Sequence, residues 1–304
     1  MTPAKFFEEK AAPRASVVNL PPRPDPPASL LDFLVERFPR VDRSTWEARF
    51  ERGLVRGGEG LPLAASSPYV AHLRLTYFRE APAAEADFGP PSIVYASRDL
   101  VVADKPPFQP VVPSGPWVRS CLLYQVAAAL EAAGEEASEL APVHRLDRAT
   151  SGLVVFCRRA ALAGGYGRLF AAGEVQRLYT AWAALPAVPE RRLFRVASRI
   201  APGEPFFRMK EVPGEPNAVT EIELAEVRGG LGRFALRPHT GKKHQLRLHM
   251  AGLGLPILGD RYYPQLLPEV PDDPGDPLRL LAGELAFRDP GSGEPRRFRS
   301  LRSV

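Results

Sequence analysis

Short strand-like stretches dominate the chain from Ser92 onward, and they do not alternate strictly with helical stretches. Apolar runs at 93–95, 100–103 and 153–156 have the length and composition of strands, and residues 220–224 alternate apolar with polar side chains. A strict alternation of strands and helices would favour a parallel sheet. Its absence predicts an α+β fold with a large, mostly antiparallel sheet and flanking helices.

The part of the chain before this sheet divides by composition into three segments. Residues 1–27 are rich in proline, which prevents helices and paired strands, so we expect an extended N-terminal arm. Residues 28–80 combine two amphipathic helical patterns with a returning strand, which predicts a small domain. Residues 81–91 have the alanine, proline and glycine composition of a linker. The main domain is therefore expected at 92–304.

The small domain carries a cluster of basic residues. Its second helix is expected to begin at residues 44–45, and Arg49, Arg52 and Arg56 follow. Two short helices followed by strands, with such a basic face, resemble the S4-type RNA-binding module. The resemblance implies that this S4-like domain binds RNA. An ordinary helical cap with a solvated basic face is the alternative.

Charge and cysteine content narrow the class of protein. The 304 residues include 40 lysines and arginines against 35 aspartates and glutamates, and the net charge of +5 is compatible with a polyanionic partner. Cys121 and Cys157 are too few for a disulfide framework and form no CxxC pair. No apolar run is long enough for a membrane helix, and residues 1–10 lack the apolar segment of a signal peptide. We therefore expect a cytoplasmic protein.

Residues 144–152 read HRLDRATSG and place several reactive side chains directly before the apolar run at 153–156. Asp147 stands between Arg145 and Arg148 in the sequence, and nearby cations keep a carboxylate ionised. An ionised carboxylate can attack an electrophilic carbon or move a proton. The alternative is a salt-bridged turn capped by the hydroxyl groups that follow.

This stretch resembles the active-site loop of the RluA-type pseudouridine synthases, whose signature is HRLDxxTSG. Residues 177–181 (RLYTA) resemble the K/R-x-Y-x-A segment of that family, and residues 240–249 (TGKKHQLRLH), with Gly-Asp at 259–260, resemble its TGRxHQIRxH…GD segment. The resemblance extends over residues 91–300. It implies the pseudouridine synthase fold and an enzyme that isomerises specific uridines in structured RNA, with ribosomal RNA preferred and transfer RNA second. It implies no cofactor, because an isomerisation needs no redox, metal or group-transfer partner.

The resemblance implies catalytic roles for three residues. Asp147 would either attack C1′ of the uridine or remove a proton from the sugar, while the C1′–N1 bond breaks and C5 bonds to C1′. Arg247 would be the cation that orients this carboxylate. Tyr179 would pack on the target uracil and is a candidate for the transfer of the C5 proton. A strand tyrosine in an ordinary core is the alternative for Tyr179.

A larger set of residues is expected to bind the substrate RNA. Arg145 would fill the place of the base that leaves its stack, because a planar guanidinium can stack there; a salt bridge within the loop is the alternative. If Thr240 caps the following helix, Lys242 and Lys243 stand at its N-terminus, where a shared phosphate would offset their unfavourable interaction with the helix dipole. The predicted RNA-binding residues are His144, Arg145, Arg148, Thr150, Arg177, Thr240, Lys242, Lys243, His244 and Gln245.

The histidines near these segments do not predict a metal site. His239, His244 and His249 are spaced by five, whereas helical zinc ligands are about three or four residues apart, and no carboxylate completes the set. His144, His244 and Gln245 are expected instead to hold loop geometry through hydrogen bonds. Asp260, which follows a glycine, is interpreted as a turn residue. No second carboxylate therefore supports a hydrolase with paired carboxylates.

The match departs from the family pattern at positions expected to face the substrate. His239 stands where arginine is usual, Pro264 where glycine is usual, and Arg177 where lysine is usual, and residues 264–277 form a proline-rich insertion. These departures leave the catalyst in place and leave the target RNA open. The alternative function is a non-catalytic RNA-binding or ribosome-assembly protein on the same fold. We expect a monomer without a membrane partner.

Overall fold

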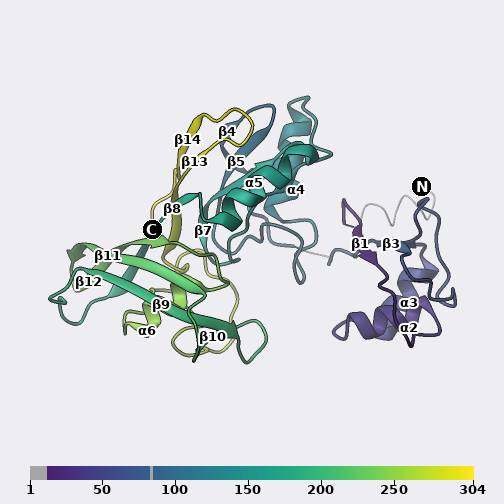
Figure 1. Ribbon diagram of the computed structural model, residues 1–304, viewed down its shortest axis with the longest axis horizontal. Coiled ribbons are helices and arrows are strands. Elements are labelled where there is room, and N and C mark those ends of the chain that lie inside the picture. Colours follow the sequence, from purple (N-terminus) through teal and green to yellow (C-terminus); the bar gives the residue numbers. More distant parts are fainter. Residues whose placement is uncertain (1–11, 83–84) are drawn as a thin grey trace. The chain divides into compact units, whose positions relative to one another are not determined.

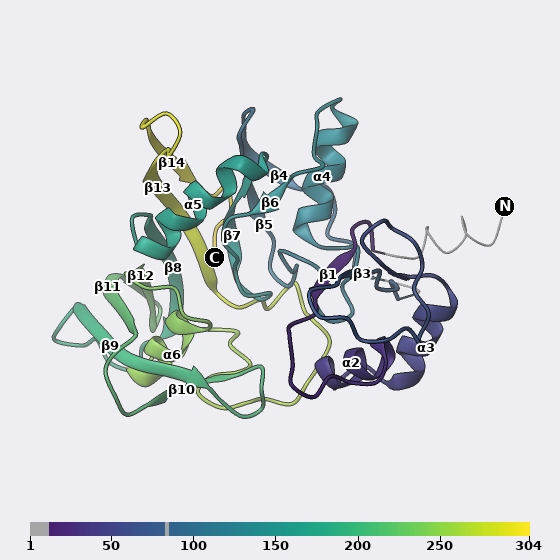
Figure 2. The same cartoon turned by 45° about the vertical axis from the view of Figure 1, so that its right-hand side comes forward.

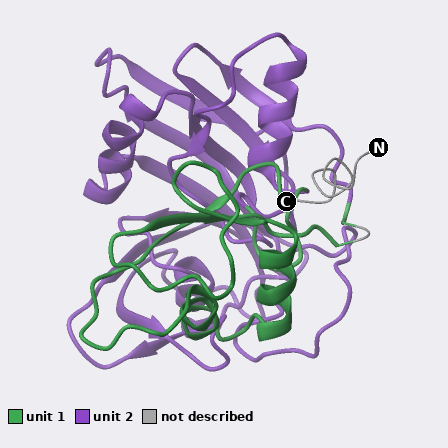
Figure 3. Ribbon diagram, turned by 90° about the vertical axis from the view of Figure 1, so that its right-hand side faces the viewer, with its two compact units in different colours: residues 1–86, 113–119 green, residues 87–112, 120–304 purple. Residues whose placement is uncertain are grey.

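The computed structural model describes residues 12–82 and 85–304. The chain forms two compact units (Figure 3): a small unit of Met1–Ala86 with Pro113–Arg119, and a large unit of Asp87–Val112 with Ser120–Val304. The loop Pro113–Arg119 thus belongs to the small unit, although it was predicted within the main domain. Parts of the predicted arm (1–11) and linker (83–84) lie outside the described residues. In the part of the chain that the structure describes, no helix is long and apolar enough to cross a membrane.

Over the residues that the structure describes, the small unit contains a three-stranded antiparallel sheet and two helices (Figure 1). Its elements are β1 (Ser16–Asn19), α2 (Leu30–Arg37), α3 (Arg43–Glu51), β2 (Val55–Arg56) and β3 (Arg74–Tyr77), with the strand order β1-β3-β2. Leu30 and Leu34 lie one helical turn apart and are fully buried with Trp46 and Leu75. This small core explains the amphipathic pattern of the first helix.

Two features of the small unit differ from the predictions. β1 lies inside the segment predicted to be an arm. The prolines at 21–27 follow this strand rather than interrupt it, so residues 16–19 are free to pair with β3. The second helix, α3, begins at Arg43 rather than at residues 44–45, because Asp42 already has the extended backbone of a cap residue.

The three arginines of the predicted basic face contact other groups of the small unit. Arg49 donates from Nε and Nη2 to Glu80 Oε2 at 3.0 and 2.9 Å. Arg56 lies in β2 rather than on the helix, and its Nε donates to Gly53 O at 3.0 Å. Arg52, directly after α3, is 44% exposed, with Nη1 3.8 Å from Glu80 Oε1. Two of the three arginines on which the RNA-binding prediction was based are therefore hydrogen-bonded within the unit, and its binding of RNA stays a prediction.

One sheet of eleven strands dominates the large unit (Figure 1). Its order is β10-β9-β11-β12-β8-β13-β7-β5-β4, with β14 paired to β13 and β6 to β7. Every pair is antiparallel except β13 with β7. The predicted α+β fold with a large, mostly antiparallel sheet is confirmed. The strands are β4 (Ser92–Ala96), β5 (Leu100–Lys105), β6 (Ala141–Pro142), β7 (Ser151–Cys157), β8 (Gln176–Ala184), β9 (Leu193–Pro202), β10 (Met209–Val212), β11 (Ala218–Arg228), β12 (Leu231–Pro238), β13 (Leu280–Arg288) and β14 (Pro295–Arg299).

Helices cover both faces of this sheet (Figure 2). They are α4 (Leu122–Ala132), α5 (Ala160–Ala172) and α6 (Gln245–Gly252). Val154 on β7 packs in the core that contains α4, whereas its neighbour Val155 packs in the core that contains Tyr166 of α5. Burial on both faces explains why β7 is apolar without alternation. Met250 of α6 packs with Ile222 of β11 in a third core.

The strand β13 links the two halves of the sheet, because it lies between β7 and β8. Its backbone approaches Gly152 so closely that a Cβ atom there would lie 2.7 Å from Ala282 N and 2.8 Å from Ala282 C. Gly152 also has a φ of +112°, which side chains disfavour. The glycine at the end of the HRLDRATSG stretch is therefore required by the meeting of two backbones.

We predict that Gly152→Ala lowers the free energy of unfolding of the large unit by about 3 kcal/mol or more, because the methyl group has no space and the backbone is strained. Chemical denaturation measures this loss. Gly134→Ala is the matched control: Gly134 has a φ of +77° but nothing within 4 Å of a Cβ, so only about 1–2 kcal/mol is expected. Equal losses in the two variants would contradict the packing argument.

Candidate active site

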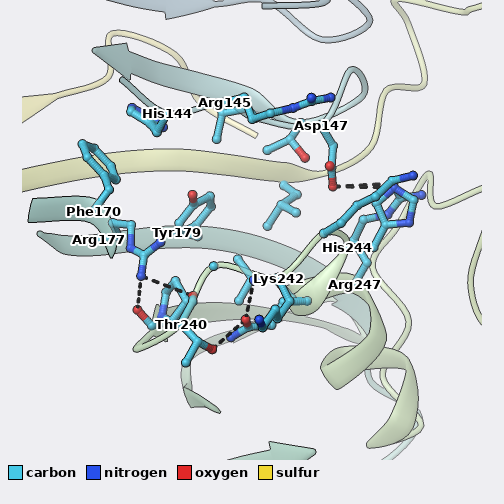
Figure 4. Close-up of a pocket in the computed structure, with 18 of the residues that line it drawn as sticks. His144, Arg145, Asp147, Phe170, Arg177, Tyr179, Thr240, Lys242, His244 and Arg247 are labelled. Carbon is cyan, nitrogen blue, oxygen red and sulfur yellow. Dashed lines mark hydrogen bonds and ion pairs between the residues drawn. The ribbon is translucent and has the colours of Figure 1, made fainter. Parts of the chain in front are cut away.

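A cavity of about 620 Å³ opens between the loop before β7, the start of β8 and the segment that leads into α6 (Figure 4). It brings together Asp147, Tyr179 and Arg247, which are far apart in sequence. Of the predicted RNA-binding residues only Arg148 does not line it. The predicted residues that line the cavity are His144, Arg145, Asp147, Thr150, Arg177, Tyr179, Thr240, Lys242, Lys243, His244, Gln245 and Arg247.

Asp147 faces this cavity with its side chain 27% exposed. Its Oδ2 lies 4.0 Å from Arg247 Nη1 and 3.9 Å from His244 Nε2 (Figure 4). Both distances are longer than the donor–acceptor distance of a hydrogen bond. The carboxylate therefore stays near a cation and an imidazole while its oxygens remain open to the cavity.

Arg247 is fixed by a second carboxylate behind it. Arg247 Nε and Nη2 donate to Asp260 Oδ2 and Oδ1 at 2.7 and 2.6 Å, and both side chains are buried. Burial opposes the charge of Arg247, but the bonds to Asp260 outweigh it and raise the pKa of the guanidinium. Asp260 Oδ1 also accepts from the backbone N–H groups of Tyr262 and Tyr263. Asp260 is thus the turn residue that was predicted and, in addition, the ion-pair partner of Arg247, which the sequence analysis missed.

We predict that Asp260→Asn lowers the free energy of unfolding by about 3–5 kcal/mol, because it leaves the buried Arg247 charge without its counter-ion. Thermal or chemical denaturation measures the change. Glu284→Gln is the control, since Glu284 pairs with the exposed Arg297 and a surface pair contributes at most about 1 kcal/mol. A loss in Asp260→Asn no larger than in the control would show that the pair is not structurally important.

Hydrogen bonds shape the segment that leads into α6. Thr240 Oγ1 accepts from Val219 N at 2.9 Å and donates to Gln245 Oε1 at 2.8 Å, which also accepts from Lys242 N at 3.0 Å. The prediction that Thr240 caps the helix is wrong, because α6 begins at Gln245 and its cap position is His244, in the left-handed conformation. The two lysines therefore precede the helix on a loop held by Thr240 and Gln245.

Two histidines of the site are neutral near pH 7. His144 Nε2 accepts from Val155 N at 3.1 Å, and its ring stacks on Phe170 at 4.3 Å between centroids. Burial, with a smaller effect of Arg177, lowers the pKa of His144 to about 3. His244 Nδ1 lies 2.9 Å from Tyr263 Oη, and burial lowers the pKa of His244 to about 4 although Asp147 opposes the shift. Neither imidazole adds positive charge beside Asp147 at neutral pH.

We predict that the protein loses stability as the pH falls from about 6.5 to about 4. In this range the unfolded state protonates His244 and the folded state does not, so His244 contributes a loss of up to about 1.4 kcal/mol per pH unit. Denaturation at a series of pH values measures the slope. His244→Gln should make the slope shallower, because the variant lacks the imidazole that the unfolded state protonates. If the dependence of stability on pH were unchanged in His244→Gln, His244 would not be a source of the loss of stability.

The remaining walls of the cavity are formed by other side chains. Tyr179 lies on β8, and burial raises the pKa of its phenol, so the hydroxyl stays protonated at neutral pH. Arg177 Nη2 donates to Pro238 O and Thr240 O at 3.1 and 3.2 Å and ties β8 to the loop before α6. Arg145 lines the cavity with an exposed side chain (Figure 4).

Arg148 is turned away from the carboxylate that it neighbours in sequence. Its guanidinium pairs with Asp272 of the proline-rich insertion, with Nη2 at 3.0 Å from Oδ1, and lies over the ring of Phe108. The expectation that Asp147 lies between two arginines is therefore wrong in space: Arg247 and His244 approach it instead.

Lys105 is a further residue that the sequence analysis missed. It is fully buried at the end of β5, and its Nζ donates to the carbonyl groups of Arg148 and Pro106 at 2.9 and 2.8 Å. Burial lowers the pKa of this amine well below its usual range. Lys105 thereby holds the backbone directly after Asp147. A lysine at the end of a strand that begins with four apolar residues was the available signal.

A family model described as RNA pseudouridylate synthase matches residues 99–252 of the chain. The chain belongs to this family. The dual-specificity RNA pseudouridine synthase RluA of Haemophilus influenzae is 34% identical over 223 residues, which are 70% of this chain and 95% of that relative. An uncharacterised RNA pseudouridine synthase of Chlorobaculum parvum is 29% identical over 298 residues, which are 88% of each chain. The predicted membership of the RluA-type synthases is confirmed.

The fold agrees with this assignment. The solved structure of human RNA pseudouridylate synthase domain containing 4 matches with a TM-score of 0.54 and 26% identity, over 68% of this chain and 87% of that one. The chain is therefore an RNA pseudouridine synthase, an isomerase that acts on uridine in RNA. The predicted enzyme class is confirmed, and the cavity around Asp147 is the candidate site for its reaction.

Proposed function

We propose that this RNA pseudouridine synthase uses Asp147 to isomerise specific uridines of a structured RNA. Ribosomal RNA is the first substrate to test and transfer RNA the second, since a relative at 34% identity is named as dual-specific. The observation that supports Asp147 as the catalyst is its position: the carboxylate faces the cavity, about 4 Å from Arg247 and His244, with no hydrogen bond to either. We further propose that the protein is cytoplasmic and monomeric.

The bond changes follow from the product. In one route an oxygen of Asp147 attacks C1′, the C1′–N1 bond breaks, and the bonding electrons leave with the uracil ring. The ring turns within the cavity, C5 bonds to C1′ and the carboxylate leaves. The proton on C5 is then lost and N1 gains one, so the product has the mass of the substrate. In the other route Asp147 first removes a proton from the sugar and later returns it. Both routes need an ionised carboxylate.

Arg247 orients the catalyst without inactivating it. Its Nε and Nη2 are occupied by Asp260, and only Nη1 points toward Asp147, at 4.0 Å. A cation at this distance favours the ionised form of the carboxylate. Because the guanidinium is held from behind, it does not close onto Asp147 and block its oxygens. Arg247 therefore acts as a positioning residue for the carboxylate.

The other cavity residues are assigned to the RNA. Tyr179 presents a neutral aromatic ring on which the uracil can stack, and its hydroxyl is a candidate to take part in the transfer of the C5 proton. Arg145 has the exposed position needed to enter the stack that the target base leaves. Lys242 and Lys243 lie on the hydrogen-bonded loop before α6 and supply positive charge for a phosphate group.

We predict that Asp147→Asn lowers turnover at least about 1000-fold, or about 4 kcal/mol in transition-state free energy, because the amide is neither a nucleophile nor a base. RNA affinity and the melting temperature should stay close to those of the wild type, since the side chain is partly exposed. Tritium release from C5-labelled uridine in RNA measures turnover. Asp276→Asn, at an exposed position of the insertion, is the matched control. Substantial turnover by Asp147→Asn would refute the mechanism.

The substrate is identified by mapping pseudouridine in ribosomal and transfer RNA from cells that lack the protein. The deletion strain is complemented either with the wild type or with Asp147→Asn. A site that is lost on deletion and restored only by the wild type identifies the target. Loss of a transfer RNA site alone would overturn the preference for ribosomal RNA.

A further inference from the structure

A series of aromatic rings leads from the cavity to the protein surface. The Arg247 guanidinium, which lines the cavity, lies over the ring of Tyr262 at 4.8 Å from its centroid, and the His244 ring is 5.7 Å from the same ring. Tyr262 contacts Phe207 at 5.1 Å between centroids, and Phe207 contacts Phe206 at 5.4 Å with the rings nearly perpendicular. The rings of residues 206, 207 and 262 therefore form a continuous aromatic series that begins against two side chains of the cavity wall.

The outer end of this series is exposed. Phe206 has 58% of its surface accessible, which is high for a large apolar residue, and Phe207 is half-buried beside it. Both lie in the turn between β9 and β10. Exposed aromatic side chains next to a functional site mark a binding surface, because their hydration is unfavourable unless a partner covers them.

The turn that carries these rings is held in place from the active site. Tyr263 Oη accepts from Met209 N at 2.7 Å and donates to Met209 O at 3.1 Å, and it also contacts His244. Arg208 Nη2 donates to Pro264 O at 3.2 Å and lies over the Tyr263 ring. Within the turn, Arg208 N donates to Pro205 O at 2.8 Å. A ligand that stacks on the turn meets rings that are already positioned, which lowers the entropic cost of binding.

The chemistry of this surface suits single-stranded RNA. Aromatic rings bind unpaired bases by stacking without a requirement for a particular sequence. On the same two segments, Arg208, Lys210 and Arg261 are accompanied by the carboxylates of Glu204 and Glu211, while Asp260 is neutralised by Arg247. The small excess of positive charge is compatible with a phosphate backbone. The contact of Tyr262 with Arg247 and His244 makes the surface continuous with the pocket for the target uridine. Because the surface adjoins that pocket, its expected occupant is a nucleotide adjacent to the target uridine.

We propose that Phe206 and Phe207 form a stacking surface for an unpaired base that neighbours the target uridine in the substrate RNA. The surface would hold the strand beside the cavity while the uridine enters it. The proposal rests on the proposed entry of RNA into the cavity at Asp147, but it does not depend on which chemical role Asp147 plays.

The test measures binding without turnover. The Asp147→Asn protein is titrated into an oligouridylate of about ten nucleotides that carries one 2-aminopurine, a base whose fluorescence falls when it stacks. We predict that Phe206→Ala in this background raises the Kd between about fivefold and 100-fold at low salt and reduces the quenching of the probe. Phe206→Trp should retain both the affinity and the quenching, because it keeps an aromatic face.

Leu193→Ala is the matched control, since Leu193 is a 64% exposed apolar residue at the opposite end of β9. Equal affinity and quenching in Phe206→Ala and Leu193→Ala would overturn the proposal and favour a protein partner for the surface. Absence of quenching by the Asp147→Asn protein itself would also overturn it. A failure of the catalytic proposal is distinguishable, because it would show as turnover by Asp147→Asn and would leave these binding constants unchanged.

Discussion

The buried ion pair between Arg247 and Asp260 is the interaction on which the active site depends. Two of the guanidinium nitrogens of Arg247 are engaged with the carboxylate, and the side chains of the two residues are 4% and 1% exposed. The pair directs the remaining nitrogen toward Asp147 and fixes the backbone at Tyr262 and Tyr263. The Tyr263 hydroxyl in turn contacts His244. A single buried charge pair therefore positions the cation, the imidazole and the aromatic residues around the carboxylate of Asp147, at a desolvation cost that its bidentate geometry offsets.

The parts of this site that sequence could predict are those carried by local motifs. HRLDRATSG, the tyrosine of the second segment and the arginine of the third were expected to converge, and they line one cavity. The residue with which each charged side chain pairs could not be predicted from these motifs, because the tertiary fold determines it. Arg148 turns to Asp272, Lys105 binds carbonyl groups, and Asp260 pairs with Arg247. Predictions from local sequence were also wrong where a neighbouring strand determined the structure of a segment. The proline-rich arm contains β1 because β3 offers it an edge, and Thr240 bonds to Val219 instead of capping α6.

The positive charge of the site depends on the burial of its basic residues as well as on their number. His144 and His244 are basic by type, yet burial lowers both pKa values far enough to keep the rings neutral near pH 7. Lys105 is buried without exposure to solvent and serves as a hydrogen-bond donor to the loop after Asp147. Among the basic groups around the Asp147 carboxylate, Arg247 lies 4.0 Å away, and Lys105 and Lys243 also interact with it electrostatically. The exposed Arg145 is left for the polyanionic substrate.

The position of β13 has a consequence for how the protein is made. This strand comes from the last part of the described chain, yet it lies between β7 and β8, the strands that adjoin the two halves of the catalytic pocket. A ribosome that has reached residue 270 has synthesised every residue that lines the pocket except Leu280, but the strand that joins the two half-sheets is still to be made. During synthesis, the catalytic motifs are therefore complete in sequence before they can be complete in space, and the nascent enzyme cannot act on RNA until its final strands emerge.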